Sequence, residues 1–128
     1  MKKGFTLLEL IVVIIIIGIL GTLGFTQYVR VVEKGRTAES KTLLGQMRSA
    51  QEAYKLEYGS YTATIGNLAV ESPTTTCTTT HYFVYSTDAT AGTATRCIAS
   101  GKAPNSSAVY TVTLTYATGV WGGSAGYY

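Results

Sequence analysis

The sequence predicts an α+β protein in which a long N-terminal helix packs against a small antiparallel β-sheet. Two patterns support this prediction. Residues 10–29 carry no charge and are followed by a half-apolar helical periodicity that continues to Tyr58. After Gly59, β-branched and aromatic residues alternate with polar ones, as they do in half-buried strands. The length of 128 residues is that of a single domain.

The composition excludes several classes of protein. The formal net charge is only +3 and the cations form no basic stripe, so a nucleic-acid binder is not expected. Ten Tyr together with many Val, Ile and Leu disfavour a disordered chain. Residues 30–58 hold ten of the charged side chains and residues 59–128 hold four. This asymmetry disfavours an ordinary water-soluble protein with one core.

The apolar segment 10–29 would form a helix roughly 30 Å long, about the thickness of a bilayer core. Lys2 and Lys3 precede it, as in secretory signals and membrane anchors. A cleaved secretory signal is disfavoured because the apolar stretch is long and no Ala-x-Ala follows it. A plain anchor leaves Glu9 to explain, because a carboxylate in lipid costs on the order of a few kcal/mol unless it is paired or lies at the headgroup level.

A third interpretation comes from a contiguous motif, Lys3-Gly4-Phe5-Thr6-Leu7-Leu8-Glu9-Leu10-Ile11-Val12-Val13. This motif resembles the N-terminal signal of type IV prepilins. The resemblance implies a pilin-like, ladle-shaped fold and a role as a filament subunit. It implies four segments: a cleaved leader at 1–4, a transmembrane and filament-core helix at 5–29, an amphipathic helix half at 30–58 and a β domain at 59–128.

The resemblance also implies roles for three residues of the motif. A prepilin peptidase would cut between Gly4 and Phe5, and Phe5 would become the N-methylated terminus. Glu9 would then pair with the terminal amine of Phe5 in the next protomer and set the axial register. Such pairing makes physical sense, because an unpaired carboxylate away from water is costly and a helix N-terminus favours a negative charge.

Gly18, Gly21 and Gly24 recur at intervals of three within the apolar helix. Type IV pilins often carry a helix-breaking proline late in this segment, but this chain has no proline before Pro73. Each glycine weakens a helix by about 1 kcal/mol relative to alanine, so the segment is a candidate for local unwinding in a filament. Small residues also permit close helix packing, and the sequence leaves both roles open.

Residues 30–58 are predicted to form the amphipathic half of the helix. The apolar stripe contains Leu43, Met47, Ala50 and Tyr54 and is broadened by Leu44, and Gly59 is placed to end the helix. Three strands are predicted after it, at 81–87, 93–100 and 108–118. Residues 121–128 are predicted to be a flexible tail with exposed aromatic side chains.

Cys77 and Cys97 are the two cysteines of the chain, which is too few for a structural zinc site. A segment exported across a membrane meets an oxidising compartment, so a disulfide is the natural expectation, with free thiols as the alternative. A closed loop of about twenty residues would stabilise the fold by roughly 3 kcal/mol in the chain-entropy model.

The residues predict no catalytic group, no metal site and no cofactor, since His81 is the one histidine and no nucleophile–base or phosphate-loop pattern occurs. The sequence therefore predicts a structural protein. By resemblance it is a pilin that assembles as a homo-oligomeric helical filament. Its partners would be the prepilin peptidase and the pilus assembly machinery, and it would move from the inner membrane to the cell surface. The alternatives are a pseudopilin of a type II secretion or DNA-uptake system, which forms a short periplasmic fibre, and a membrane-tethered binding or enzymatic domain.

Overall fold

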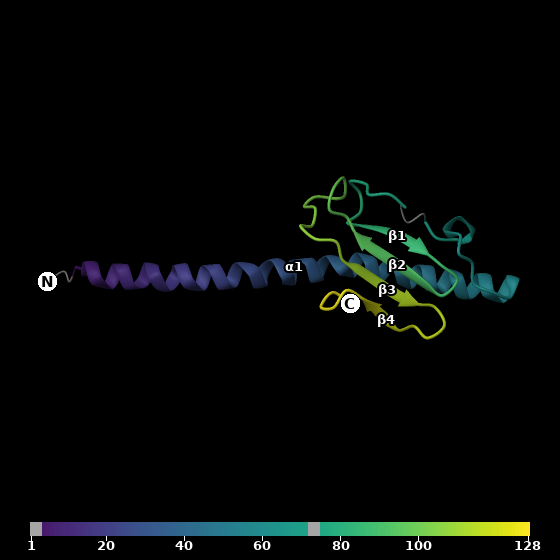
Figure 1. Ribbon diagram of the computed structural model, residues 1–128, viewed down its shortest axis with the longest axis horizontal. Coiled ribbons are helices and arrows are strands. Elements are labelled where there is room, and N and C mark those ends of the chain that lie inside the picture. The colour runs from purple at the N-terminus through teal and green to yellow at the C-terminus, as the bar shows by residue number, and fades with distance from the viewer. Residues whose placement is uncertain (1–3, 72–74) are drawn as a thin grey trace. The chain divides into compact units, whose positions relative to one another are not determined.

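The computed structural model describes residues 4–71 and 75–128 and contains one long helix and four strands in these ranges (Figure 1). The chain divides into two compact units, Met1–Glu33 and Lys34–Tyr128. The elements in chain order are helix α1 (Leu7–Tyr58), 3-10 turn η1 (Ile65–Asn67) and strands β1 (Phe83–Thr87), β2 (Ala91–Arg96), β3 (Thr111–Thr115) and β4 (Trp121–Gly123). An α+β fold is confirmed.

Helix α1 ends where the sequence predicts. Its last residue is Tyr58, and Gly59 follows with a φ of +84°. The Gly59 N–H donates to the carbonyl oxygen of Lys55 at 2.8 Å. A glycine adopts this left-handed conformation without strain, so it closes the helix by bonding one of the last free carbonyls.

The four strands form an antiparallel meander in the order β1-β2-β3-β4. β3 shows the predicted alternation: Val112 and Leu114 are buried, whereas Thr111, Thr113 and Thr115 are half-exposed. Within the unit Lys34–Tyr128, the buried face packs against the second half of α1 (Figure 1). The core contains apolar residues of both elements, namely Leu44, Met47, Phe83, Tyr85, Ala94, Tyr110, Val112 and Leu114.

The face of α1 that meets the sheet agrees with the predicted stripe only at Leu44 and Met47. Leu44 and Met47 are fully buried, whereas Leu43 is only partly buried and Tyr54 instead stacks on Tyr58 with ring centroids 4.4 Å apart. Other buried positions of this face are polar or small, namely Thr37, Ser40 and Gln51. An apolar periodicity cannot reveal them, so the stripe predicted through Leu43, Ala50 and Tyr54 was rotated from the true face.

Gln51 can be buried because both the nitrogen and the oxygen of its side-chain amide are hydrogen-bonded. Its Nε2 donates to the carbonyl oxygen of Thr62 at 2.7 Å and to Thr87 Oγ1 at 3.1 Å, and its Oε1 accepts from the Thr62 N–H at 3.0 Å. A buried amide without partners would be destabilising, so these three bonds compensate its removal from water. Gln51 thereby ties α1 to the segment that follows it and to β1.

The predicted strand limits at 81–87, 93–100 and 108–118 were too wide at several ends. β2 stops at Arg96 because Cys97 is held in a disulfide and the chain then turns. Residues 116–118 form a turn, in which Tyr116 is buried and its N–H donates to Thr90 O at 2.9 Å. Local alternation continues past a strand, whereas pairing with a neighbour does not.

The prediction of a flexible tail was wrong. Residues 121–123 form β4, which pairs with β3 through Leu114↔Trp121 and Val112↔Gly123. Tyr127 stacks on Tyr110 with ring centroids 3.9 Å apart and 11° between the rings. The sequence pattern missed this strand because Trp-Gly-Gly has no apolar alternation, whereas the buried ring of Tyr110 supplies the surface that holds the tail.

Candidate functional site

The peptide bond between Gly4 and Phe5 lies in an exposed, non-helical stretch just before α1. Phe5 is 88% exposed, and a side chain at Gly4 would meet no atom within 4 Å. A non-helical, exposed backbone is one that a peptidase can reach. The rest of the predicted leader, residues 1–3, lies outside the described residues.

Glu9 and Thr6 bond reciprocally at the start of α1. Glu9 Oε2 accepts from the Thr6 N–H and from Thr6 Oγ1, both at 2.8 Å, and the Glu9 N–H donates to Thr6 Oγ1 at 3.2 Å. This is a capping box, in which two residues three apart satisfy free donors of a helix start. It holds the Glu9 carboxylate in place at the helix N-terminus.

Sequence reasoning assigned Glu9 no partner within its own chain, so the role of Thr6 was missed. The Thr-x-x-Glu spacing ahead of an apolar run is itself the signal that could have found it. Glu9 remains exposed despite these bonds. Its position is therefore compatible with a further cation brought by another chain.

No described residue of the chain covers the apolar part of α1. Large apolar side chains between Leu7 and Val31 are 42–76% exposed, and Ile17 is 63% exposed. By length and composition, this is a helix that could cross a membrane, and its most apolar window has no buried residue. Such a surface is unstable in water, so a bilayer or other protein must cover it.

The three glycines of this segment lie within continuous α-helix. A side chain introduced at Gly18, Gly21 or Gly24 would meet no atom within 4 Å. Thr22 Oγ1 donates to the carbonyl oxygen of Gly18 at 2.9 Å. The single chain is thus helical here, and the predicted unwinding in a filament remains a prediction.

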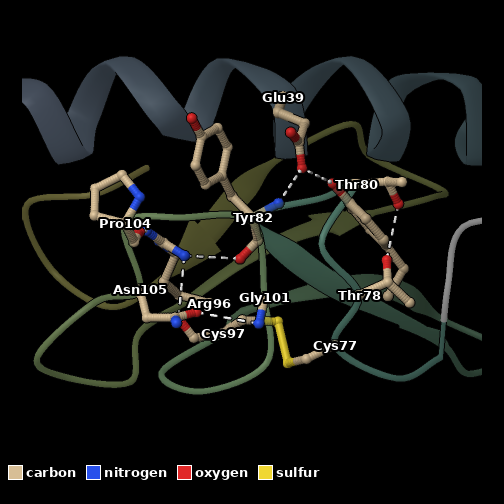
Figure 2. Close-up of a disulfide and its surroundings, with 11 residues drawn as sticks. Glu39, Cys77, Thr78, Thr80, Tyr82, Arg96, Cys97, Gly101, Pro104 and Asn105 are labelled. Carbon is tan, nitrogen blue, oxygen red and sulfur yellow. Dashed lines mark hydrogen bonds between the residues drawn. A yellow bond between two sulfur atoms is a disulfide. The ribbon is translucent and has the colours of Figure 1, made fainter.

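Cys77 and Cys97 form the predicted disulfide, with Cα atoms 5.9 Å apart. The bridge joins the segment before β1 to the end of β2 (Figure 2). His81 lies between them in sequence, and its Nδ1 is 2.8 Å from Thr80 Oγ1. Within the described ranges, no group of three or more His, Cys, Asp or Glu could hold a metal ion.

Comparisons with known proteins address both halves of the chain. Residues 37–123 match the family described as type IV pilin-like G and H, and residues 1–25 match the prokaryotic N-terminal methylation motif. A comparison with curated proteins finds no match. The first range covers more than half of the chain, and the second contains Gly4, Phe5 and Glu9. This chain therefore belongs to the type IV pilin-like G and H family and is a pilin or pseudopilin subunit.

Proposed function

We propose that the chain is the structural subunit of a type IV pilus-like filament at the cell surface. The observation that carries this proposal is the uncovered apolar helix that begins directly after a prepilin-type cleavage motif. A bilayer covers that surface in the precursor, and the helices of neighbouring subunits cover it in the filament. The same apolar surface thus serves first as an anchor and then as the filament core.

Cleavage between Gly4 and Phe5 creates a cationic amine next to the helix start. Two hydrogen bonds from Thr6 hold the Glu9 carboxylate at that start, and the Glu9 N–H donates a third to Thr6 Oγ1. Side by side in a dry helix bundle, a carboxylate on one subunit and an amine on the next neutralise each other. Sliding the helices by one turn would separate the two charges, so the pair sets the register.

Replacing Gly4 with Val tests processing. The β-branched side chain crowds the scissile bond, so the uncut precursor is expected to accumulate in the membrane and no filament to form. The measurement is mass spectrometry of the membrane pool together with electron microscopy of sheared cell-surface material. Gly66→Ala is the matched control, because a side chain there meets no atom within 4 Å. Normal filaments from the Gly4→Val variant would contradict the proposal.

Replacing Glu9 with Val tests assembly separately from processing. The variant is expected to be cut and methylated at Phe5 and yet to yield few filaments.

The length of the wild-type fibres distinguishes a pilus subunit from a pseudopilin. Long sheared fibres that begin at methylated Phe5 support a pilus, whereas a processed subunit that stays in the envelope supports the pseudopilin. If the chain kept a binding or enzymatic activity after its apolar helix was replaced, the membrane-tethered domain would be indicated instead.

A further inference from the structure

The charged side chains of the unit Lys34–Tyr128 are unevenly distributed along α1. The start of this unit carries three cations, Lys34, Arg36 and Lys41, against one carboxylate, Glu39. The last two turns carry Glu52 and Glu57, and Lys55 is the one cation there. One end of the unit is therefore basic and the other is acidic. The loops that flank each end add to the same imbalance.

At the basic end, three cations surround the ring of Tyr82. The charged groups of Arg36, Arg96 and Lys102 lie 5.4, 5.1 and 4.9 Å from the ring centroid. The three residues come from α1, β2 and the loop after β2. We call these four residues the Tyr82 cluster. Glu39 lies beside it and accepts from the Tyr82 N–H at 2.9 Å (Figure 2).

Lys102 lies in a loop that is held in place on several sides. Arg96 Nη2 donates to the carbonyl oxygen of Pro104 at 2.8 Å, and the Lys102 N–H donates to that of His81 at 2.9 Å. The Cys77–Cys97 disulfide anchors the start of the loop (Figure 2). Lys102 itself is exposed. A cation on a fixed loop loses little conformational freedom when it binds a partner.

At the acidic end, the last turns of α1 and the segment after η1 form an open groove of about 830 Å³. Two carboxylates line it, Glu57 from the helix and Glu71 from the segment after η1. Tyr54 and Tyr58 form its aromatic wall, and Tyr58 is 63% exposed. A hydrogen bond to Glu57 and the charge of that carboxylate raise the pKa of Tyr58. The neighbouring Leu56 is 89% exposed.

The groove and the Tyr82 cluster are too far apart to meet within one chain. Arg36 and Glu57 are 21 residues apart on one helix, which corresponds to about 32 Å at 1.5 Å per residue. Complementary surfaces at opposite ends of one unit fit a head-to-tail contact between copies. Such a heterologous contact repeats without closing when the copies stack along an axis, and it then generates a filament.

We propose that the Lys102 loop of one copy docks into the groove of a second copy, where Lys102 pairs with Glu57 and Glu71. This inference rests on the proposed function, because it describes a contact between globular domains in the filament. The aromatic wall and Leu56 are covered in the same contact. Opposite charges then select the axial neighbour, and a neighbour docked in reverse would bring like charges together.

A charge-swap series in the full chain tests the docking. Lys102→Glu alone, and Glu57→Lys with Glu71→Lys, should each lower the yield of sheared filaments by about tenfold, because each places like charges in contact. Combining all three changes should restore the yield to within about threefold of wild type, since the pairing is restored with inverted signs. Lys102→Arg keeps the charge, so it is the matched control and should assemble normally.

Folding is checked by the disulfide-bonded subunit in the membrane fraction, the amount of which should not fall in any variant. Carbodiimide treatment of wild-type filaments should also join Lys102 to Glu57 or Glu71, as detected by mass spectrometry of the peptides. Normal yield from the single reversals, or loss without restoration in the combined variant, would overturn the docking and leave the filament proposal intact. Absence of wild-type filaments would overturn both.

Discussion

Arg96 shows how one buried charge organises the end of the sheet. It is 1% exposed, and its guanidinium donates to the carbonyl oxygens of Tyr82, Cys97 and Pro104 at 2.8–3.0 Å. These carbonyls belong to three separate stretches of chain. Bonds from a charged donor are stronger than neutral ones, so Arg96 replaces regular pairing where β2 stops.

Arg96→Met is expected to destabilise the domain by about 3 kcal/mol, because three partly buried carbonyls lose their donor. The measurement is denaturant unfolding of the full chain in mild detergent, followed by Trp121 fluorescence. Lys34→Met is the control, since Lys34 is exposed, and it should change the free energy of unfolding by less than about 0.5 kcal/mol. Equal effects of the two changes would show that the three bonds contribute nothing specific.

Asp88 gives the β1–β2 turn a dependence on pH. Its Oδ1 accepts from Thr90 Oγ1 and the Thr90 N–H, each at 2.6 Å, and from the Ala91 N–H at 2.8 Å. These bonds, with that from the Thr90 side chain as the largest cause, lower the pKa of Asp88 below its usual value. The folded state therefore binds this proton less readily than the unfolded chain does.

A group whose pKa falls on folding stabilises the protein above its unfolded pKa, which is about 3.9 for Asp. That contribution is lost as the pH falls through the folded pKa. Asp88→Asn is thus expected to lower stability by a constant amount near neutral pH and to approach wild type below about pH 4. Unfolding curves of both proteins across this range provide the measurement. A difference that persists unchanged at acid pH would refute the role of the charge.

At the scale of elements, β4 depends on one glycine. Gly123 has a φ of +122°, and a side chain there would overlap the carbonyl oxygen of Thr111 on β3. The Ser124 N–H donates to the same carbonyl at 2.9 Å. A three-residue strand has few bonds of its own, so close approach of the two backbones is what keeps it paired.

Gly123→Ala is expected to cost about 2–3 kcal/mol, since it adds both backbone strain and a backbone overlap. Gly126→Ala isolates the strain, because Gly126 has a φ of +89° but open space around it, and it should cost about 1 kcal/mol. Thermal unfolding monitored by circular dichroism provides the comparison. An alanine at 123 that costs no more than one at 126 would contradict the close approach.

At the scale of the whole molecule, the two units obtain their stability in different ways. Every residue of the hydrophobic core cluster lies in the unit Lys34–Tyr128. The disulfide lies there too. The apolar segment of α1 before that unit has no buried residue in its most apolar window. Membrane or filament contacts must stabilise it instead.

A fragment of residues 34–128 is therefore expected to fold as a soluble, disulfide-bonded monomer that forms no filaments. Circular dichroism and size-exclusion chromatography, with and without reductant, measure its folding and its association. Reduction should lower its stability by roughly 3 kcal/mol, in line with a loop of about twenty residues. An unfolded fragment would show that the first unit is required for the fold, and a polymerising one would show that the apolar helix is not needed for assembly.

Features that depend on neighbouring residues could be read from the sequence. The prepilin-type motif and the end of α1 at Gly59 each depend on a few adjacent residues, and the alternation in β3 follows from the two-residue period of a strand. The Thr6–Glu9 capping box is equally local and was readable from its spacing. The pairing of Cys77 with Cys97 could be predicted because the chain has two cysteines and an export-type N-terminus.

Features that join distant segments were decided by the tertiary structure alone. The buried face of α1 includes Gln51, whose partners lie in later segments. β4 pairs only because β3 presents an open edge to it. The Tyr82 cluster gathers cations from α1, β2 and a loop. No short-range pattern encodes such contacts, because each depends on where the folded chain places a second segment.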